Sequence, residues 1–361
     1  MITVSNKDFD LKIRKKKIEK GMELTILPRI KFSQYHTGHT LRAFLNTLFV
    51  LIKSYDLAHV FVFPVHPMAI PALAVKLLRR KPLVIDGDDL WHGGWANYHP
   101  WPVKKQLEFC EDKLGFLADK ITVVSEKMKS RFLEAGIKKE KIVKIPNGAN
   151  VEEIKPMEQK LARKKLKLDE QNPLVLVMGH TYTEGLFFFL KAFAKVVKLN
   201  PKVKLLFLGK MALSKEGEER VKKVSQEIGT ENIIFVGEKS FKEVPFYLGA
   251  ADILALPMED NPIEEARSPM RLGDYLASGR PIVANAVGEV KNVLLDFNCG
   301  LVSSPKDSDE FAQNIIRVLE DKKLAKSLGR KARKTAEDIL AWSCIATDLE
   351  KVYFQVLRER K

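Results

Sequence analysis

Two arginines and an aspartate near residue 270 have a spacing that suits a bound diphosphate. Arg267, Arg271 and Asp274 lie on one stripe of a predicted helix in "EARSPMRLGDYLASGRP". Ser268 is the predicted N-cap and Pro269 the first helical residue. A helix start carries partial positive charge, which disfavours the arginines unless an anion lies between them. We therefore predict that the arginines and the first helical amides bind a diphosphate, while Asp274 accepts hydrogen bonds from ribose hydroxyls.

Further polar residues follow predicted strands in the same half of the chain. His180 follows "LVLVMG", Lys210 follows "LLFLG", and Gly237 ends "IIFVG". Open α/β sheets bind ligands at the carboxyl ends of their strands, so these residues are expected to line the same site. Each glycine taken alone indicates only a tight turn. The alternative for the arginines is neutralisation by Glu264 and Glu265 on a solvated surface.

A second cluster of ligand-type residues lies in the first half of the chain, in "LVIDGDDLWHGGWANYHPW". Aromatic faces stack on pyranose rings, while Asp, His and backbone amides bind the hydroxyls, so the segment predicts a sugar site. The ligand spacing is too irregular to favour a metal. The alternative is a solvated loop whose tryptophans pack in the core. The candidate acceptor-side residues are His66, Asp88, Asp89, Gly93 and Gly94.

The elements that position these residues are predicted from eleven short apolar runs that alternate with helical patterns. Apolar runs bounded by turn residues are typical of buried parallel strands, and the helices supply the crossovers. The fold class is therefore α/β, with two Rossmann-like domains and two parallel sheets. The predicted strands cover residues 23–28, 59–64, 82–86, 121–125, 142–147, 174–179, 203–209, 233–237, 252–257, 281–286 and 300–304.

A charged stretch separates the two groups of predicted strands, and it divides the chain into two domains followed by a C-terminal helix. We expect an N-terminal domain over residues 1–155, a C-terminal domain over 156–338, and a helix over 339–361 that packs back toward the first domain. A doubly wound domain opens with a strand and a Gly-rich turn, which this chain lacks. We therefore expect that a first strand and Gly-rich loop, about thirty residues, are missing from the N-terminus.

The composition restricts the partners and the compartment. The formal net charge is +15, which attracts nucleic acid, anionic lipid or phosphorylated small molecules. Without zinc-finger spacing or an RNP signature, nucleic acid is disfavoured. The runs "KIRKKKIEK" and "ARKKLKLDE" are interpreted as solvated faces. Three widely spaced cysteines, and an apolar stretch too short to span a bilayer, favour a cytoplasmic protein.

Several enzyme classes are excluded by missing motifs. The chain contains no Gly-x-Ser-x-Gly elbow, no Walker loop and no Gly-x-Gly-x-x-Gly. Hydrolases with a nucleophile elbow, P-loop ATPases and standard dehydrogenases are therefore excluded.

Three blocks of the sequence together resemble the retaining glycosyltransferases of family 4, which have the GT-B fold. The blocks are "IPNGANVEEIKP", "FVGEKSFKEVPFYLGAADILALPMED" and "SPMRLGDYLASGRPIVANAVGEV", and "VIDGDDLWHGG" matches more loosely. With the C-terminal helices, the resemblance covers most of residues 120–355. It implies two Rossmann-like domains facing a central cleft, with a nucleoside-diphosphate (NDP) sugar between them held mainly by the second domain.

The resemblance also implies roles for single residues. Asp274 stands where the family has the glutamate that holds the donor ribose. Ala266 stands where the family's other glutamate contacts the transferred sugar, and Glu264 or Glu265 is the candidate substitute. The Arg–Lys pair that the family has in the region of His180 is missing from this chain. Its positive charge is expected to come from Arg267, Arg271 and Lys210. The candidate catalytic residues are His92, Glu265 and Arg271. The candidate donor-binding residues are His180, Lys210, Gly237, Arg267, Ser268, Pro269, Met270 and Asp274.

The implied activity is metal-independent transfer of a sugar, with retention, from an NDP-sugar to a glycan or a lipid-linked acceptor. No cofactor and no nucleic acid are expected. Peripheral contact of the protein with the inner face of an anionic membrane is compatible with the positive charge. Three alternatives remain: a nucleotide-sugar-binding protein without catalysis, a basic nucleic-acid-binding protein, and a GT-B epimerase.

Overall fold

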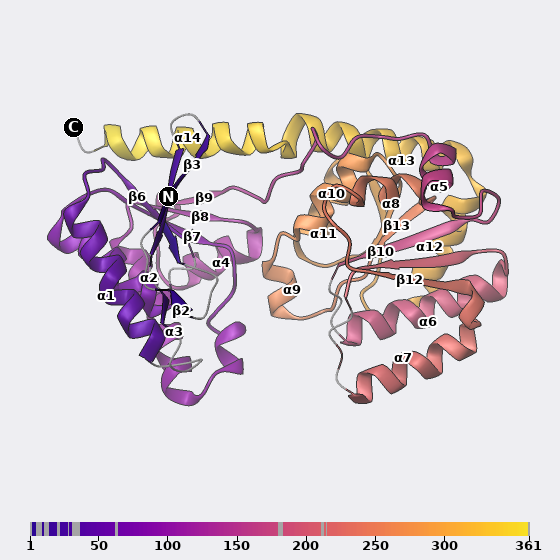
Figure 1. Ribbon diagram of the computed structural model, residues 1–361, viewed down its shortest axis with the longest axis horizontal. Helices are drawn as coiled ribbons and strands as arrows, with labels where there is room; N and C mark the ends of the chain where they lie inside the picture. The colour runs from indigo at the N-terminus through magenta and orange to yellow at the C-terminus, as the bar shows by residue number, and fades with distance from the viewer. Residues whose placement is uncertain are drawn as a thin grey trace. The chain divides into compact units, whose positions relative to one another are not determined.

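The computed structural model describes residues 2–4, 9–10, 14–19, 22–27, 29–30, 37–61, 64–179, 183–210, 213 and 215–359 (Figure 1). The chain forms two compact units. Unit 1 comprises Met1–Lys144 together with Glu350–Lys361, and unit 2 comprises Ile145–Leu349. None of the helices in the described ranges is long and apolar enough to cross a membrane.

The core of unit 1 is a parallel sheet in the order β6-β7-β8-β9. Its inner strands are apolar and almost fully buried, as in Leu83–Ile85 of β7, which is typical of a sheet covered on both faces. The strands are β6 (Ala58–Val60), β7 (Leu83–Gly87), β8 (Lys120–Val123) and β9 (Ile142–Lys144). The helices are α1 (Thr37–Ile52), α2 (His66–Leu73), α3 (Trp101–Leu117) and α4 (Glu126–Glu134).

The first strands of unit 1 form two small separate sheets. The strand predicted at residues 23–28 exists as β4, but it pairs with β1 and β3 and does not join the four-stranded sheet. Only two residues separate β3 from β4, and such a short connection permits only antiparallel pairing. The five strands are β1 (Ile2–Val4), β2 (Phe9–Asp10), β3 (Arg14–Glu19), β4 (Met22–Leu27) and β5 (Arg29–Ile30).

Unit 2 contains a six-stranded parallel sheet in the order β12-β11-β10-β13-β14-β15. All six predicted strands of this half are confirmed, and so are the two predicted parallel sheets. The strands are β10 (Leu174–Met178), β11 (Lys204–Leu208), β12 (Ile233–Gly237), β13 (Ile253–Leu256), β14 (Ile282–Asn285) and β15 (Gly300–Ser303).

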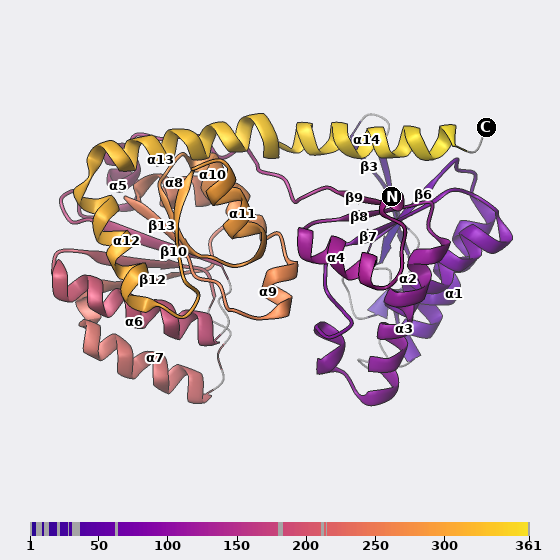
Figure 2. The same ribbon diagram turned by 180° about the vertical axis from the view of Figure 1, so that it is seen from behind.

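Helices cover both faces of this sheet. Figures 1 and 2 show α6 and α7 on one face and α8 and α10 on the other. Phenylalanines of α6 and α12 fill the core beside β10 and β11, among them Phe189, Phe193 and Phe311. The helices of unit 2 are α5 (Gln159–Leu166), α6 (Thr183–Leu199), α7 (Lys215–Ile228), α8 (Val244–Ala250), α9 (Pro262–Ala266), α10 (Met270–Ser278), α11 (Gly288–Asp296), α12 (Ser308–Glu320) and α13 (Lys322–Thr335). The last helix, α14 (Trp342–Arg358), begins in unit 2, and its residues from Glu350 onward belong to unit 1.

Candidate functional site

Three glycines form the carboxyl edge of the unit 2 sheet where β10, β11 and β12 end. Gly179, Gly209 and Gly237 all have positive φ angles, of 98°, 132° and 73°. The amide of Gly209 donates to the carbonyl of Gly237 at 2.9 Å. A Cβ on Gly209 would lie 2.9 Å from the carbonyl oxygen of Gly179, closer than real side chains come. Glycine is therefore required here, and it leaves backbone exposed to a ligand at this edge.

Arg271 reaches this edge from the first turn of α10. Its Nη1 donates to the carbonyl of Met178 at 3.3 Å. The same nitrogen lies 3.6 Å from the position that a Cβ on Gly179 would take. The guanidinium therefore lies over the end of β10, at the edge where open α/β sheets bind ligands.

The start of α10 differs from the prediction in its capping residue. The N-cap is Pro269, whose own side chain makes no capping hydrogen bond, so the prediction of Ser268 as N-cap is wrong. The hydroxyl of Ser268 accepts from the amide of Asn147 at 3.4 Å, and its carbonyl accepts from Asn147 Nδ2 at 2.7 Å. Ser268 thus binds the segment before α5 and does not cap the first turn of α10. Next to them, the side chain of Met270 is 45% exposed.

Asp274 lies one turn further along α10 and is held by Asn150. Asn150 Nδ2 donates to Asp274 Oδ1 at 3.2 Å. Burial raises the pKa of Asp274, and the Asn150 hydrogen bond opposes that rise. This contact depends on glycine, because a Cβ on Gly273 would lie 2.7 Å from the carbonyl oxygen of Gly148. Asp274 is therefore an oriented carboxyl group whose second oxygen accepts no hydrogen bond from the described residues.

Arg267 has a nearby carboxylate partner. Its Nη1 forms an ion pair of 2.7 Å with Glu264, whose side chain is only 4% exposed. Ala266 is fully buried, and Glu265 is half-buried on the same short helix α9. The charge of Arg267 is thus balanced within the protein, so the case for a bound diphosphate depends more on Arg271.

Tyr275 ties these elements together and was not anticipated from the sequence. Its hydroxyl accepts from the amide of Met178 at 2.8 Å and donates to the carbonyl of Ala255 at 3.3 Å. Burial raises the pKa of Tyr275. The hydroxyl joins α10 to β10 and β13, and these hydrogen bonds position the first turn of α10, with Arg271, over the end of β10.

The start of α6 is capped by another residue that the sequence did not reveal. Glu259 Oε1 accepts from the amide of Gly185 at 2.9 Å. Lys210 follows Gly209 and its side chain is exposed at the same edge of the sheet. His180 lies outside the described residues. Within the described ranges, no three His, Cys, Asp or Glu side chains converge as ligands for a metal ion.

In unit 1, the loop that follows β7 is held by a buried glutamate of α3. Glu111 accepts from the amides of Trp91 and His92 at 3.0 and 2.8 Å, and burial raises its pKa. The side chain of His92 stays 43% exposed, and its Nδ1 lies 3.0 Å from Asp112. Arg131 also bonds Asp112. His92 is thus oriented by a carboxylate while its ring remains open to solvent.

The other acceptor-side candidates lie in or near this loop. Burial raises the pKa of Asp88, and Asp89 accepts from the indole of Trp95 at 3.2 Å. Gly93 is exposed with a φ of 75°, while a Cβ on Gly94 would collide with the carbonyl of Leu90. His66 begins α2, and its side chain lies outside what the structure describes.

A buried polar cluster lies beneath this loop. Thr122 donates to Asp86, and His59 contacts both Thr122 at 3.4 Å and the hydroxyl of Tyr353 at 2.7 Å. Burial raises the pKa of Asp86 to about 7, and the nearby Asp88 adds to the rise while Thr122 opposes it. Burial lowers the pKa of His59 to about 4. The cluster therefore links folding stability to pH.

Asp86→Asn is expected to stabilise unit 1 at neutral pH and to have little effect near pH 4. Between pH 4 and 7 folded Asp86 keeps a proton that the unfolded chain loses, so this residue makes stability fall as pH rises. His59 acts oppositely between pH 4 and 6.5, because the unfolded chain holds the extra proton there. The gain from Asp86→Asn should reach about 2–4 kcal/mol at pH 7.5.

Urea unfolding at pH 4.5 and 7.5, followed by tryptophan fluorescence, measures this gain. Asp56→Asn, an exposed position in the same unit, is the control. A gain that is equal at both pH values would contradict the assignment.

Two protein-family models match the chain. One, described as glycosyl transferases group 1, matches residues 158–335, and the other, described as glycosyltransferase family 4, matches residues 10–153. The lipopolysaccharide 1,2-N-acetylglucosaminetransferase of Salmonella typhimurium is 28% identical over 239 residues, which are 64% of this chain and 61% of that protein. The chain thus spans less than two thirds of the length of that relative.

Solved structures support the fold. Sucrose-phosphate synthase from Thermosynechococcus elongatus matches with a TM-score of 0.76 at 20% identity, over 99% of this chain and 89% of that one. The Anabaena protein HepE, solved with UDP and glucose, matches with a TM-score of 0.69 at 19% identity, over 91% and 85%. The chain therefore belongs to glycosyltransferase family 4, the glycosyl transferases group 1, and has the GT-B fold.

Proposed function

We propose that the protein transfers a sugar from an NDP-sugar to a glycan or lipid-linked acceptor with retention of configuration. The observation that carries the proposal is the position of Arg271, over the end of β10 and on the first turn of α10. A guanidinium and the start of a helix at one point form a site for a diphosphate. Family membership and the UDP complex of HepE agree with such a donor.

The site would stabilise the leaving diphosphate. Arg271, Lys210 and the amides of α10 donate to oxygens that gain charge as the bond to the sugar breaks. Asp274, held by Asn150, accepts hydrogen bonds from the ribose hydroxyls. The acceptor hydroxyl attacks from the face that the diphosphate leaves, and its proton passes to the departing phosphate. Glu265 and His92 are the candidates for contact with the transferred sugar.

The acceptor is proposed from the names of two relatives and from the charge of the chain. The Salmonella relative is named for lipopolysaccharide, and a Corynebacterium glutamicum relative for a monoacylated phosphatidylinositol monomannoside. Both names refer to glycolipids. The net charge of +15 would favour approach to an anionic lipid surface.

A protein that binds the donor without catalysis is the second candidate. Two observations favour it, namely the buried Ala266 at the position where the family has a sugar-contacting glutamate, and the ion pair that engages Arg267. It predicts donor binding without turnover. Release of free nucleotide in the presence of a matching sugar donor would contradict this second candidate.

The first test is thermal stabilisation by UDP, GDP and ADP. One nucleotide is expected to stabilise the wild type, by about 2.7 kcal/mol at one hundred times its dissociation constant. Asp274→Asn removes the charge that accepts the ribose hydroxyls, so the dissociation constant should rise about tenfold, which is worth about 1.4 kcal/mol. Asp296→Asn, an exposed position in the same unit, should leave binding unchanged. If no nucleotide raises the melting temperature, the donor site is refuted.

A further inference from the structure

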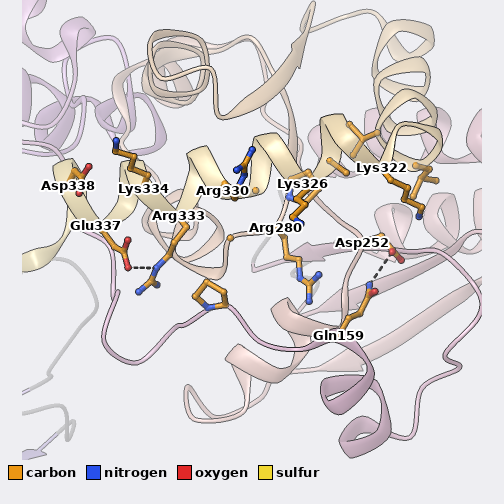
Figure 3. A pocket seen from close by; sticks show the side chains of 17 residues that line it. Gln159, Asp252, Arg280, Lys322, Lys326, Arg330, Arg333, Lys334, Glu337 and Asp338 are labelled. Atoms are coloured by element: carbon orange, nitrogen blue, oxygen red, sulfur yellow. Dashed lines mark hydrogen bonds and ion pairs between the residues drawn. The ribbon is translucent and has the colours of Figure 1, made fainter.

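A cavity of about 760 Å³ lies in unit 2 at the amino-terminal edge of the sheet. Its lining includes Asp252, which precedes β13, and Pro281, which precedes β14. In Figure 3, α13 runs along one side of the pocket, and Arg280 lies across from it. The arginine site described above lies at the carboxyl edge of the same sheet, so this cavity is a separate feature.

The lining of the pocket carries an excess of positive charge. The three acidic residues in the lining are Asp252, Glu337 and Asp338. Asp252 already pairs with Arg163 at 2.7 Å, and Glu337 pairs with Arg333 at 2.7 Å. The six cationic residues in the lining are Arg280, Lys322, Lys326, Arg330, Arg333 and Lys334.

The charge comes mainly from α13, which has seven Lys and Arg and no acidic residue among its 14 residues. Lys322, Lys326 and Arg330 form no ion pair or hydrogen bond through their side chains with any described residue, and all three are exposed. In Figure 3, Lys322 and Lys326 extend toward the side of α13 on which Arg280 lies. Like charges that line one cavity repel each other, and an anion between them would remove that repulsion.

Arg280 provides a cationic group deeper in the pocket. Its Nη2 donates to the carbonyl of Met157 at 2.9 Å and to the carbonyl of Gly249. The other two guanidinium nitrogens donate to none of the described residues. Burial lowers the pKa of Arg280, and the neighbouring charge of Arg163 adds to this effect while Asp252 opposes it. A half-buried guanidinium with unused donors favours an oxyanion ligand, because charge-assisted hydrogen bonds are strong.

We propose that this pocket, lined by α13 and Arg280, binds a ligand that carries two or more phosphate groups. The cations are spread along a helix from Lys322 to Arg330, so one phosphate could not reach them all. The volume lies within the range of small-molecule sites. The phosphates could belong to a soluble compound or to a lipid headgroup, and the recognition chemistry is the same for both.

Lysine acetylation with tripolyphosphate as the probe tests the proposal on the full chain. Tripolyphosphate is expected to slow acetylation of Lys322 and Lys326 several-fold, measured by mass spectrometry. Lys323 and Lys331 are exposed on the same helix but do not line the pocket, so they serve as internal controls. Binding at the donor site would protect none of these four lysines. Equal rates with and without the probe, or equal protection of all four, would overturn the proposal.

Two matched double variants test whether tripolyphosphate binds in this pocket. Lys322→Gln with Lys326→Gln should weaken tripolyphosphate binding about tenfold at this site. Lys323→Gln with Lys331→Gln removes the same net charge and should leave the affinity within about twofold. Equal loss in both variants would show general electrostatic attraction and would overturn the proposal. Calorimetry at fixed ionic strength measures the affinities.

Vesicles identify the source of the phosphates. Sedimentation with vesicles of phosphatidylcholine and cardiolipin, a lipid whose headgroup carries two phosphates, is compared for the two double variants. If vesicle binding falls only in the Lys322/Lys326 variant, the ligand is a lipid headgroup. If vesicle binding is the same in both variants while tripolyphosphate binding differs, the ligand is soluble.

Discussion

Arg271→Gln is expected to lower kcat for sugar transfer by about 10²- to 10³-fold, the usual cost of removing one donor from a developing oxyanion. The guanidinium lies at the end of β10, where it would contact the diphosphate, and its loss leaves the leaving group to Lys210 and the helix amides. The effect should fall on kcat more than on KM, because charge on the diphosphate grows in the transition state.

The assay uses the NDP-sugar of the nucleotide that stabilises the protein. The rate at which free nucleotide is released from this donor gives kcat. Arg271→Lys keeps the charge but loses the planar fork, so it should recover only part of the rate. Arg317→Gln removes an exposed arginine of α12 in the same unit and should leave kcat unchanged. An Arg271→Gln enzyme with wild-type kcat would remove this residue from the leaving-group site.

Arg163→Ala should lower the free energy of unfolding of unit 2 by about 3–5 kcal/mol, the cost of leaving a buried charge unpaired. Arg163 is 3% exposed and forms an ion pair of 2.7 Å with Asp252. It also donates to the carbonyls of Ala250, Asp169, Glu170 and Asn172. Its removal would cost Asp252 its ion pair and would take this donor from the carbonyls of Asp169, Glu170 and Asn172, while Gln159 would still donate to Ala250 and Asp252.

Urea unfolding followed by circular dichroism gives this loss. Lys164→Ala is the matched control, since Lys164 is the next residue of α5 and carries the same charge on an exposed side chain. It should change the free energy of unfolding by less than about 0.5 kcal/mol. Equal effects of the two substitutions would show that the buried network does not stabilise the unit.

Local patterns predicted much of the fold and part of the site. Strands of unit 2 such as β10 and β13 are continuous apolar runs, and such runs are recognisable without any partner. The stripe that joins Arg271 to Asp274 follows from helical spacing within four residues. Each of these features depends only on residues that are close together in the sequence, so it can be recognised from the sequence alone.

Features that depend on distant partners were missed or predicted wrongly. Asn150 and Asp274 are 124 residues apart, and nothing local shows that they meet. The run "ARKKLKLDE" suggests a solvated face, but Arg163 within it is buried because its acceptors lie on α8, at Asp252 just before β13, and in a following turn. Ser268 looked like an N-cap because its competing partner, Asn147, belongs to a distant segment.

Hydrogen–deuterium exchange with the stabilising nucleotide is the most direct test of the donor site. The account predicts protection of the amides of residues 268–275 and of the end of β10, with no change along α13. Protection confined to α13 would move the nucleotide to the cationic pocket. Unchanged exchange at residues 268–275, with nucleotide bound, would contradict the claim that Arg271 and the start of α10 hold the diphosphate.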